Sequence, residues 1–379
     1  MDRNGSQLEN MSFFQNSTHD ELKPRHDREI CGADPIMFSI LSVTIGSIGL
    51  LGNLGFMFVV MRVKSMQTAT NHYLINLAMA DLLYVLVLWI FHLCLMISED
   101  GACIFDTSQG LRCVVGTVVD TAILTSNFSV AFIGIERYVA ITQPFRARQI
   151  CTKGKTIYFN ILMWILSIII TLPSAVACLA NNPPESIYIA IYFLLIVSCC
   201  VSLCTVTILY SLTIYHFKKT AKAMREINDT RHRTPNHDKA VVRLCVLTTV
   251  VYFVCLFPTE LSLILRLSVQ YKGPAVSEAA AGCIHNISII LVLLHSAANP
   301  IIYNVMSSKY REAFVTALAS CFSRNRNGHL ANRSYYYSRT LNTSTVRTVG
   351  HDKNLINRNT QKCYVCPKEV DDYSRTTSM

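Results

Sequence analysis

The sequence predicts an all-α membrane protein: a seven-transmembrane helix bundle with a short amphipathic eighth helix. Of its 379 residues, 51% are hydrophobic and only 15% are charged, whereas soluble globular domains carry about 25% charged residues. Seven apolar stretches are each long enough to cross roughly 30 Å of hydrocarbon as a helix. They span approximately residues 36–61, 73–97, 113–141, 157–179, 187–217, 241–267 and 275–306.

The Lys and Arg residues between these stretches predict the orientation of the chain. The second, fourth and sixth connections hold only Arg112 and Lys272. Basic residues crowd the first, third and fifth connections, at Arg62, Lys64, Arg146, Arg148, Lys153, Lys155, Lys218, Lys219, Lys222, Arg225, Arg231, Arg233 and Lys239. Because basic residues accumulate in cytoplasmic loops, we expect a multi-pass protein of the plasma membrane with an extracellular N-terminus. The net charge of +10 then reflects topology, and we expect no nucleic-acid partner.

Four regions follow from this reading. Residues 1–35 form an extracellular tail, and its Asn4, Asn10 and Asn16 each begin an N-x-S/T sequon for glycosylation. We expect the first apolar helix to serve as the insertion signal, because no cleavable signal peptide precedes it. Residues 36–306 form the membrane domain, 307–321 the amphipathic helix and 322–379 a disordered cytoplasmic tail.

Several cysteines fall on or near the outer face, where disulfides persist: Cys31, Cys103, Cys113, Cys178 and Cys283. Cys113 begins the third stretch, and Cys178 is the only cysteine near the connection from the fourth to the fifth, so we favour this pair. Cys31 with Cys283 is an alternative second bridge, since pairing cannot be read from sequence. Cysteines inside the apolar stretches, such as Cys199, are expected to be small packing residues.

A carboxylate, Asp81, lies several residues inside the second stretch. Charged groups at this depth are costly and mark functional sites. Asn53, Ser126 and Asn299 lie on three other stretches and could join Asp81 in one buried polar cluster. Its oxygen atoms suit a small hard cation, which predicts a structural sodium ion as the one cofactor. A water-filled polar network without an ion is the alternative.

A charge pair ends the third stretch, in the sequence Glu136-Arg137-Tyr138. Asp238, at the cytoplasmic end of the sixth stretch, is a second candidate partner for Arg137. These groups could form a switch that opens when helices move. The alternatives are a juxtamembrane pair among lipid headgroups and, for Asp238, a solvated loop acid.

The outer half of the bundle carries two acids, Asp120 on the third stretch and Glu260 just past the proline of the sixth. Unpaired acids at membrane depth imply a cation nearby, so we expect a ligand with a basic group. His92, His285 and Arg266 are expected to line the same mouth. The alternative is that Glu260 pairs with Arg266 or a histidine and is structural.

The segment after the seventh stretch has apolar residues at helical spacing, including Tyr310, Phe314 and Leu318. This pattern predicts a helix lying on membrane lipid. Cys321 at its end is a candidate palmitoylation site, with a free cytosolic thiol as the alternative. Beyond residue 324 the chain is polar, and phosphorylation there would create a site for an arrestin-like partner, on Ser338, Thr340, Thr343, Ser344, Thr345 and Thr348.

The order of these motifs resembles that of rhodopsin-like G-protein-coupled receptors, over the chain from about Ile36 to Cys321. The residues that carry the resemblance are Asn53, Leu77–Asp81, Cys113, Glu136–Tyr138, Trp164, Pro258 and Asn299–Tyr303. The segments Thr70–Leu74, Ser296–Asn304 and Ser308–Phe314 look most like neuropeptide receptors of the thyrotropin-releasing-hormone, ghrelin and neuromedin branch.

The resemblance implies a receptor rather than an enzyme, with an extracellular peptide ligand and a heterotrimeric G protein as partners. It adds Tyr210, Asn299, Pro300 and Tyr303 to the cytoplasmic switch. The chain departs from the family pattern at the residues usually Trp, Phe, Pro and Asn, which here are Leu256, Tyr252, Ser202 and His295. The trigger between ligand and switch is therefore expected to be built differently.

Other classes of protein fit the sequence less well. Counted from Cys113, Asp120 stands where amine receptors carry their amine-binding Asp; counted from Arg137, it is one residue away. One residue rotates a side chain by about 100°, which would turn Asp120 toward a helix side and disfavours an amine receptor. A transporter or channel would show an internal repeat, which is absent, and a retinal pigment needs a lysine, which 275–306 lacks.

Overall fold

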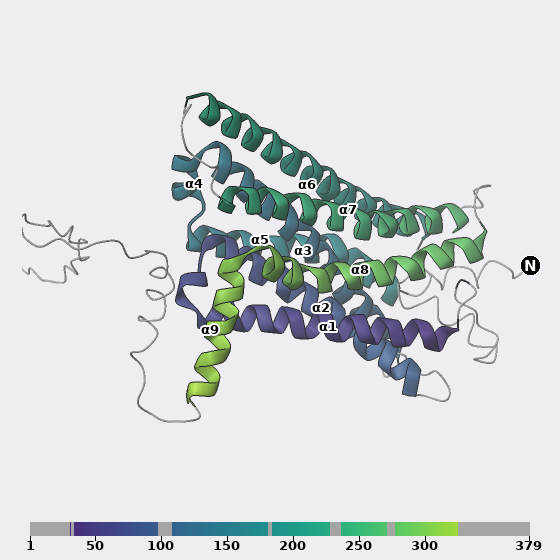
Figure 1. Ribbon diagram of the computed structural model, residues 1–379. Coiled ribbons are helices and arrows are strands. Elements are labelled where there is room, and N and C mark those ends of the chain that lie inside the picture. Colours follow the sequence, from purple (N-terminus) through teal and green to yellow (C-terminus); the bar gives the residue numbers. More distant parts are fainter. Residues whose placement is uncertain are drawn as a thin grey trace, which may run out of the picture. The chain divides into compact units, whose positions relative to one another are not determined.

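The computed structural model describes Cys31 and residues 34–97, 108–180, 184–227, 236–270 and 277–324. Seven long helices in this part match the predicted stretches: α1 (Pro35–Arg62), α2 (Ala69–Ile97), α3 (Gln109–Thr142), α5 (Lys153–Leu179), α6 (Glu185–Ile227), α7 (Asn236–Gln270) and α8 (Glu278–Met306). Figure 1 shows them running side by side as a bundle. The sequons, the tail from residue 325 and the side chains of Asp238, Arg266 and Cys321 lie outside the described part.

Polar caps mark where several of the helices begin. Asp34 Oδ1 accepts a hydrogen bond of 2.8 Å from the Ile36 backbone N–H, and Pro35 occupies the first turn, where a missing N–H costs nothing. Ser108 Oγ accepts from the Leu111 N–H at 3.2 Å and so starts α3. Ser277 caps α8 in the same way.

The outward faces of the bundle are apolar. Six of the described helices are long and apolar enough to cross a membrane, and α7 adds the shorter apolar segment Val250–Leu265. On α5 the exposed residues include Ile161, Ile169 and Val176, each more than half exposed. A contiguous apolar surface of this size fits contact with lipid rather than water.

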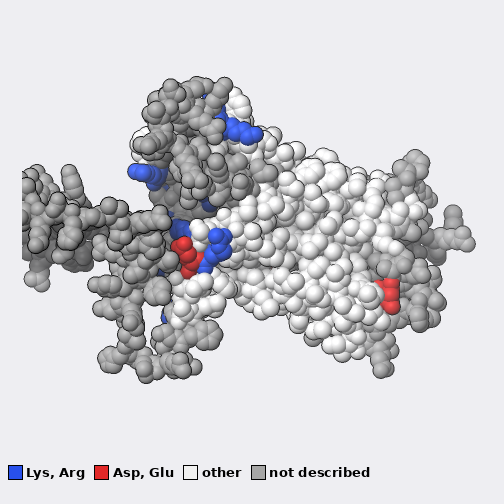
Figure 2. Space-filling model, viewed as in Figure 1, with Lys and Arg blue, Asp and Glu red and all other residues white. Residues whose placement is uncertain are grey.

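The charges of the bundle gather at its ends. On the face drawn in Figure 2, a wide uncharged surface separates the end rich in Lys and Arg from the opposite end. Arg62 lies in the last turn of α1, Lys153 at the start of α5 and Lys218 near the end of α6. Alternating helix directions bring these positions to one end, as a bilayer-spanning arrangement requires.

The third helix is the centre of the bundle. It packs against α2, α4, α5 and α6, and 67% of its apolar window is buried, against 22% for α5 and for α6. It therefore carries Asp120, Ser126 and Arg137 through the core from the outer to the inner half.

The first and eighth helices approach each other closely at a glycine. A Cβ atom on Gly52 would lie 3.2 Å from Cγ of Pro300. One residue further on, the Asn53 amide donates hydrogen bonds of 3.0 Å to the Gly49 carbonyl and 3.1 Å to the Ser296 carbonyl. A side chain at Gly52 would force the Pro300 ring to move, so the glycine allows this close approach of the two helices.

Besides the seven long helices, the described part of the chain contains the predicted amphipathic helix and two short elements that were not predicted. The amphipathic eighth helix is α9 (Ser308–Arg324); Ala313 and Ala317 are buried on it, while Val315 is 66% exposed. The connection after α3 forms α4 (Pro144–Ile150), which the sequence analysis did not predict. A single turn, η3 (Lys64–Met66), follows α1.

Candidate functional site

An outer cavity of about 130 Å³ lies among six helices of the bundle. Its wall is mostly apolar and holds two carboxyl groups, from Asp120 on α3 and Glu260 on α7. Its other lining residues come from α2, α5, α6 and α8 as well, and include Tyr84, Ser174, Ile191, Tyr192, Cys199, Leu263 and Val292. An apolar pocket with a few convergent polar groups is the usual form of a ligand site.

The structure corrects the expected orientation of Asp120. The count from Arg137 predicted that Asp120 would turn toward a helix side, but it lines the cavity. The neighbouring Val119 is instead fully buried. The α3 residues that line the cavity recur every three or four positions and so form one face of the helix, and Asp120 lies on this face with Cys113, Gly116, Thr117, Ile123 and Leu124. The rotation argument against an amine ligand therefore no longer applies.

Glu260 is 6% exposed and forms a hydrogen bond with the thiol of Cys199 on α6. Its second oxygen, Oε2, has no hydrogen-bond partner among the described residues. Cys199 in turn accepts a bond of 3.6 Å from the Asn127 side chain on α3. Cys199 was predicted to be a packing residue; it is buried in the core, and its thiol in addition contacts polar groups from two other helices.

Neither of the two predicted histidines lines the outer cavity. His92 is buried between α1 and α2, with Nδ1 3.5 Å from Ser39 Oγ and with the rings of Phe38 and Phe91 against its own. Its apolar surroundings place it away from the mouth, contrary to the prediction. His285 is half-buried on α8 outside the cavity wall.

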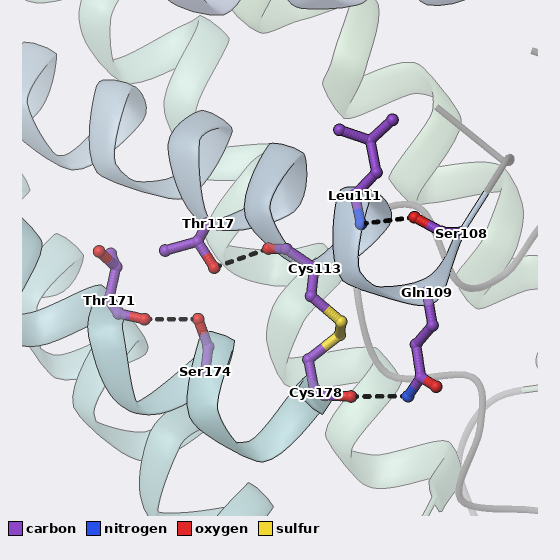
Figure 3. Close-up of a disulfide and its surroundings, with 8 residues drawn as sticks. All are labelled: Ser108, Gln109, Leu111, Cys113, Thr117, Thr171, Ser174 and Cys178. Atoms are coloured by element: carbon purple, nitrogen blue, oxygen red, sulfur yellow. Dashed lines mark hydrogen bonds between the residues drawn. A yellow bond between two sulfur atoms is a disulfide. The ribbon is translucent and has the colours of Figure 1, made fainter. Parts of the chain in front are cut away.

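A disulfide joins Cys113 and Cys178 at the rim of the outer cavity, with Cα atoms 5.7 Å apart. Figure 3 shows this bridge between the start of α3 and the end of α5. Beside it, the Gln109 side chain donates a hydrogen bond of 2.9 Å to the Cys178 carbonyl. The bridge confirms the favoured pair and fixes the end of α5 against the start of α3.

A second disulfide joins Cys31 and Cys283, the pairing that the sequence left open. It ties the residues before α1 to the first turns of α8. Free cysteines among the described residues include Cys199, Cys204 and Cys255.

An inner cavity of about 10 Å³ lies below the outer one, and Tyr84, Ile123 and Val292 line both. Its volume is close to what a single water molecule needs. Asp81 lines it and accepts hydrogen bonds of 2.9 Å from Ser126 and 2.8 Å from Asn299.

The polar cluster around Asp81 differs from the predicted one in two members. Asn53 was expected to join it but bonds to backbone carbonyls of α1 and α8 instead. Ser296, which the sequence analysis did not assign, lines the cavity and forms a hydrogen bond with Asp81. The reason is rotational: helix α1 turns Asn53 toward α8 rather than toward α2.

Three of the four residues that depart from the family pattern, Leu256, Tyr252 and His295, lie close together at this depth. Leu256 and His295 line the inner cavity, and the rings of Tyr252 and His295 pack edge to face with centroids 5.6 Å apart. Both ring nitrogens of His295 lack a hydrogen-bond partner among the described residues. A small cation or a water in the cavity would meet these nitrogens as well as the oxygens of Asp81 and Ser126.

The charge pair at the end of α3 is formed. Arg137 Nε lies 3.6 Å from Glu136 Oε2, and the Thr70 hydroxyl on α2 donates a 2.8 Å hydrogen bond to Glu136 Oε1. The Arg137 side chain is 28% exposed and that of Glu136 is 10% exposed. Thr70 was missed as a partner because only the placement of α2 beside α3 brings it to Glu136. The predicted partner Asp238 cannot be compared, since its side chain lies outside the described part.

Aromatic residues surround this pair. The rings of Tyr138 and His216 meet with centroids 5.8 Å apart, and Tyr210 is buried. Tyr303, three residues after Pro300, packs against Tyr310 of α9 with centroids 5.9 Å apart. Burial raises the pKa of Tyr310 to about 12, so its hydroxyl stays protonated at neutral pH and donates to the side-chain oxygen of Asn71.

A third polar link holds the inner half of the bundle together. The Trp164 indole on α5 donates a 2.9 Å hydrogen bond to Asn76 on α2, whose amide donates a 2.8 Å bond to Ser129 on α3. Asn76 and Ser129 were not singled out from the sequence. An Asn in an apolar helix is a signal that could have found them, because it needs a partner inside the bundle.

Comparison with known proteins identifies the family. The family described as 7 transmembrane receptor (rhodopsin family) matches residues 52–303 of the chain. The mouse neuromedin-U receptor 1 is 26% identical over 352 residues, which cover 84% of this chain and 80% of that receptor. The rat somatostatin receptor type 4 is 27% identical over 311 residues, covering 78% and 76%.

The mouse neuromedin-U receptor 2 is similar to the same extent, with 26% identity over 345 residues, 81% of this chain and 83% of that receptor. These relatives agree with the neuromedin resemblance of the motifs. The matched region runs from the Gly52 contact in α1 to Tyr303 in α8 and so includes both cavities and the charge pair. This multi-pass membrane protein is therefore a receptor of the rhodopsin family of seven-transmembrane receptors.

Proposed function

We propose that this receptor binds an extracellular peptide with a basic group in the outer cavity and activates a heterotrimeric G protein at its cytoplasmic end. The observation that carries the proposal is the pair of carboxyl groups, Asp120 and Glu260, in the wall of one cavity. The names of the neuromedin-U and somatostatin receptors support a peptide as the ligand class.

The two acids favour a cationic ligand on energetic grounds. Placing each charged carboxyl at membrane depth costs roughly 2.5–3.5 kcal/mol on insertion scales. Glu260 Oε2 has no partner among the described residues. A guanidinium or ammonium group of the ligand would supply the missing partner. Its pairing with the carboxyl groups would offset part of the free energy that their burial costs.

A screen of a peptide library tests the ligand class, with arrestin recruitment and G-protein activation as separate readouts. We expect basic peptides among the agonists. Asp120→Asn and Glu260→Gln should each lower agonist potency about tenfold or more, because each removes a charge-assisted hydrogen bond. Asp34→Asn is the matched control, since this acid caps α1 outside the cavity and its change should leave potency unaltered.

An amine is the second candidate ligand, and the position of Asp120 in the cavity wall favours it. The same screen should therefore include monoamines. If amines alone activate the receptor and Asp120→Asn abolishes their effect, the receptor binds an amine and the peptide proposal is wrong.

At the cytoplasmic end, we propose that the Glu136–Arg137 pair holds the resting state, with Asp238 as a further partner of Arg137. The Thr70 hydrogen bond supports this proposal, since it orients Glu136 toward the arginine. Ligand would act by preferring the arrangement in which Arg137 is released, because a ligand shifts an equilibrium only through its differential affinity. The strongly exposed Phe145 of α4 offers an apolar contact for a G protein.

The remaining proposals concern the membrane and the tail. The basic residues at the α4 end of the bundle support an extracellular N-terminus in the plasma membrane. The exposed apolar side chains of α9, such as Val315, support contact with lipid, which palmitoylation at Cys321 would strengthen. An arrestin-like protein would bind the phosphorylated tail.

A further inference from the structure

We propose that Cys199 is a positioning residue that couples the outer cavity to the core of the bundle, by joining Glu260 on α7 to Asn127 on α3. This inference rests on the proposed function, since it assigns a route by which a ligand in the outer cavity reaches the inner half. Its basis is two adjoining hydrogen bonds at one thiol, to Glu260 and from Asn127.

The link runs from one cavity to the other. Glu260 and Cys199 line the outer cavity, whereas Asn127 lines the inner one beside Asp81 and Ser126. Cys199, Glu260 and Asn127 are all more than nine-tenths buried. In such surroundings a polar group that loses its partner is costly. A change at Glu260 is therefore passed to Cys199 and Asn127 rather than absorbed by water.

The free oxygen of Glu260 makes the link responsive to ligand. Oε2 has no partner among the described residues, although the carboxyl group is held by the thiol. A cation that binds at this free oxygen draws electron density from the carboxyl group and so weakens the hydrogen bond that the Cys199 thiol donates to it. Once the thiol is released, α6 and α7 lose a direct polar connection. The Cys199 sulfur, which accepts the hydrogen bond from Asn127, is then no longer held in place.

The link also lies close to Leu256 on α7, the position at which members of the family usually have a Trp. Leu256, one turn before Glu260 on α7, is buried in the inner cavity wall and offers no polar group. The hydrogen bonds at the Cys199 thiol instead connect α3, α6 and α7. The link is present together with the Glu136–Arg137 pair, so we assign it to the resting state and expect it to stabilise that state.

Ligand-independent G-protein activation in cells, at matched surface expression, tests the coupling. Cys199→Ala removes both bonds and should raise basal activation about two- to tenfold, the factor that corresponds to one net hydrogen bond. Cys199→Ser can still donate to Glu260 and accept from Asn127, so it should stay at the wild-type level. Cys204→Ala is the matched control, because this cysteine of α6 is exposed on the outer surface.

A double-mutant cycle separates the link from general loosening. Cys199→Ala and Glu260→Ala break the same bond, so the double variant should match the stronger single variant rather than multiply the two effects. Glu260→Gln can still accept from the thiol, so its basal activation should lie below that of Glu260→Ala, while a cationic agonist should bind either variant more weakly. If Cys199→Ala does not reach the surface, Asn127→Ala breaks the neighbouring bond.

Three outcomes would overturn the coupling: Cys199→Ala equal to Cys204→Ala, Cys199→Ser as active as Cys199→Ala, or multiplicative effects in the double variant. In each of these cases the receptor still signals, and only the link is wrong. If neither the wild type nor any variant activates a G protein, with or without peptides, the proposed function fails and the coupling fails with it.

Discussion

At the scale of single residues, functional polar groups were easier to identify from the sequence than the residues that they contact. Asp81, Ser126 and Asn299 do meet, because each stands as a polar group in an apolar run and has nowhere else to turn. Thr70 and Cys199 were missed as partners. A hydroxyl or a thiol is common in packed helices, and only the rotation of each helix about its axis decides what it contacts.

Asp81 leads to a prediction about sodium. We propose that the inner cavity holds a sodium ion on the oxygens of Asp81 and Ser126, each of which keeps free lone pairs. Replacing sodium chloride by an organic chloride salt at equal ionic strength should raise basal G-protein activation about twofold or more. This factor applies when the sodium concentration equals the dissociation constant and the ion binds only the resting state. Asp81→Asn should remove this dependence. Equal activation in both salts for the wild type would show that water fills the cavity.

At the scale of elements, the seven long helices and α9 were predicted and α4 was not. Apolar stretches set the long helices, so their existence follows from composition, while their ends follow from caps such as Ser108. The α4 segment is too short and too polar to stand out in a hydropathy pattern. Its helix depends on Pro144 at the first turn and on packing against α3.

The contact between α1 and α8 yields a prediction about packing. Gly52→Val should destabilise the receptor by about 1–3 kcal/mol, because its Cβ would lie 3.2 Å from Pro300 and would push the two helices apart. Thermal denaturation of the purified receptor and its amount at the cell surface would both report the loss. Gly154→Val is the control, since nothing lies within 4 Å of a Cβ at that position; equal losses for both variants would refute the packing argument.

At the scale of the whole molecule, length, composition and loop charges were enough to predict the bundle, and the resemblance of its ordered motifs to those of rhodopsin-like receptors predicted the family. The distribution of ligand-site residues was harder to predict. Asp120 and Glu260 reach one cavity, but His92 does not, because a histidine on an apolar helix can be enclosed by Phe38 and Phe91 as easily as it can face a ligand. Neither hydropathy nor spacing separates these two environments.

The orientation of the molecule can be tested at its N-terminus. If the tail is extracellular, its three sequons should carry glycans, and N-glycosidase treatment of the receptor from cells should lower its apparent mass on a gel. Replacing Asn4, Asn10 and Asn16 by Gln together should abolish this shift and leave the receptor in the membrane fraction. An untreated wild-type receptor that already runs with the triple variant would argue for a cytosolic tail.

The bridge between Cys31 and Cys283 has a topological consequence. It joins residues 252 positions apart in the sequence, so the backbone from just before α1 to the first turns of α8 is a covalent ring, from which α9 and both chain ends extend. A single cut between α6 and α7 opens this ring without releasing a fragment. The two halves of the receptor stay covalently joined until the bridge is reduced.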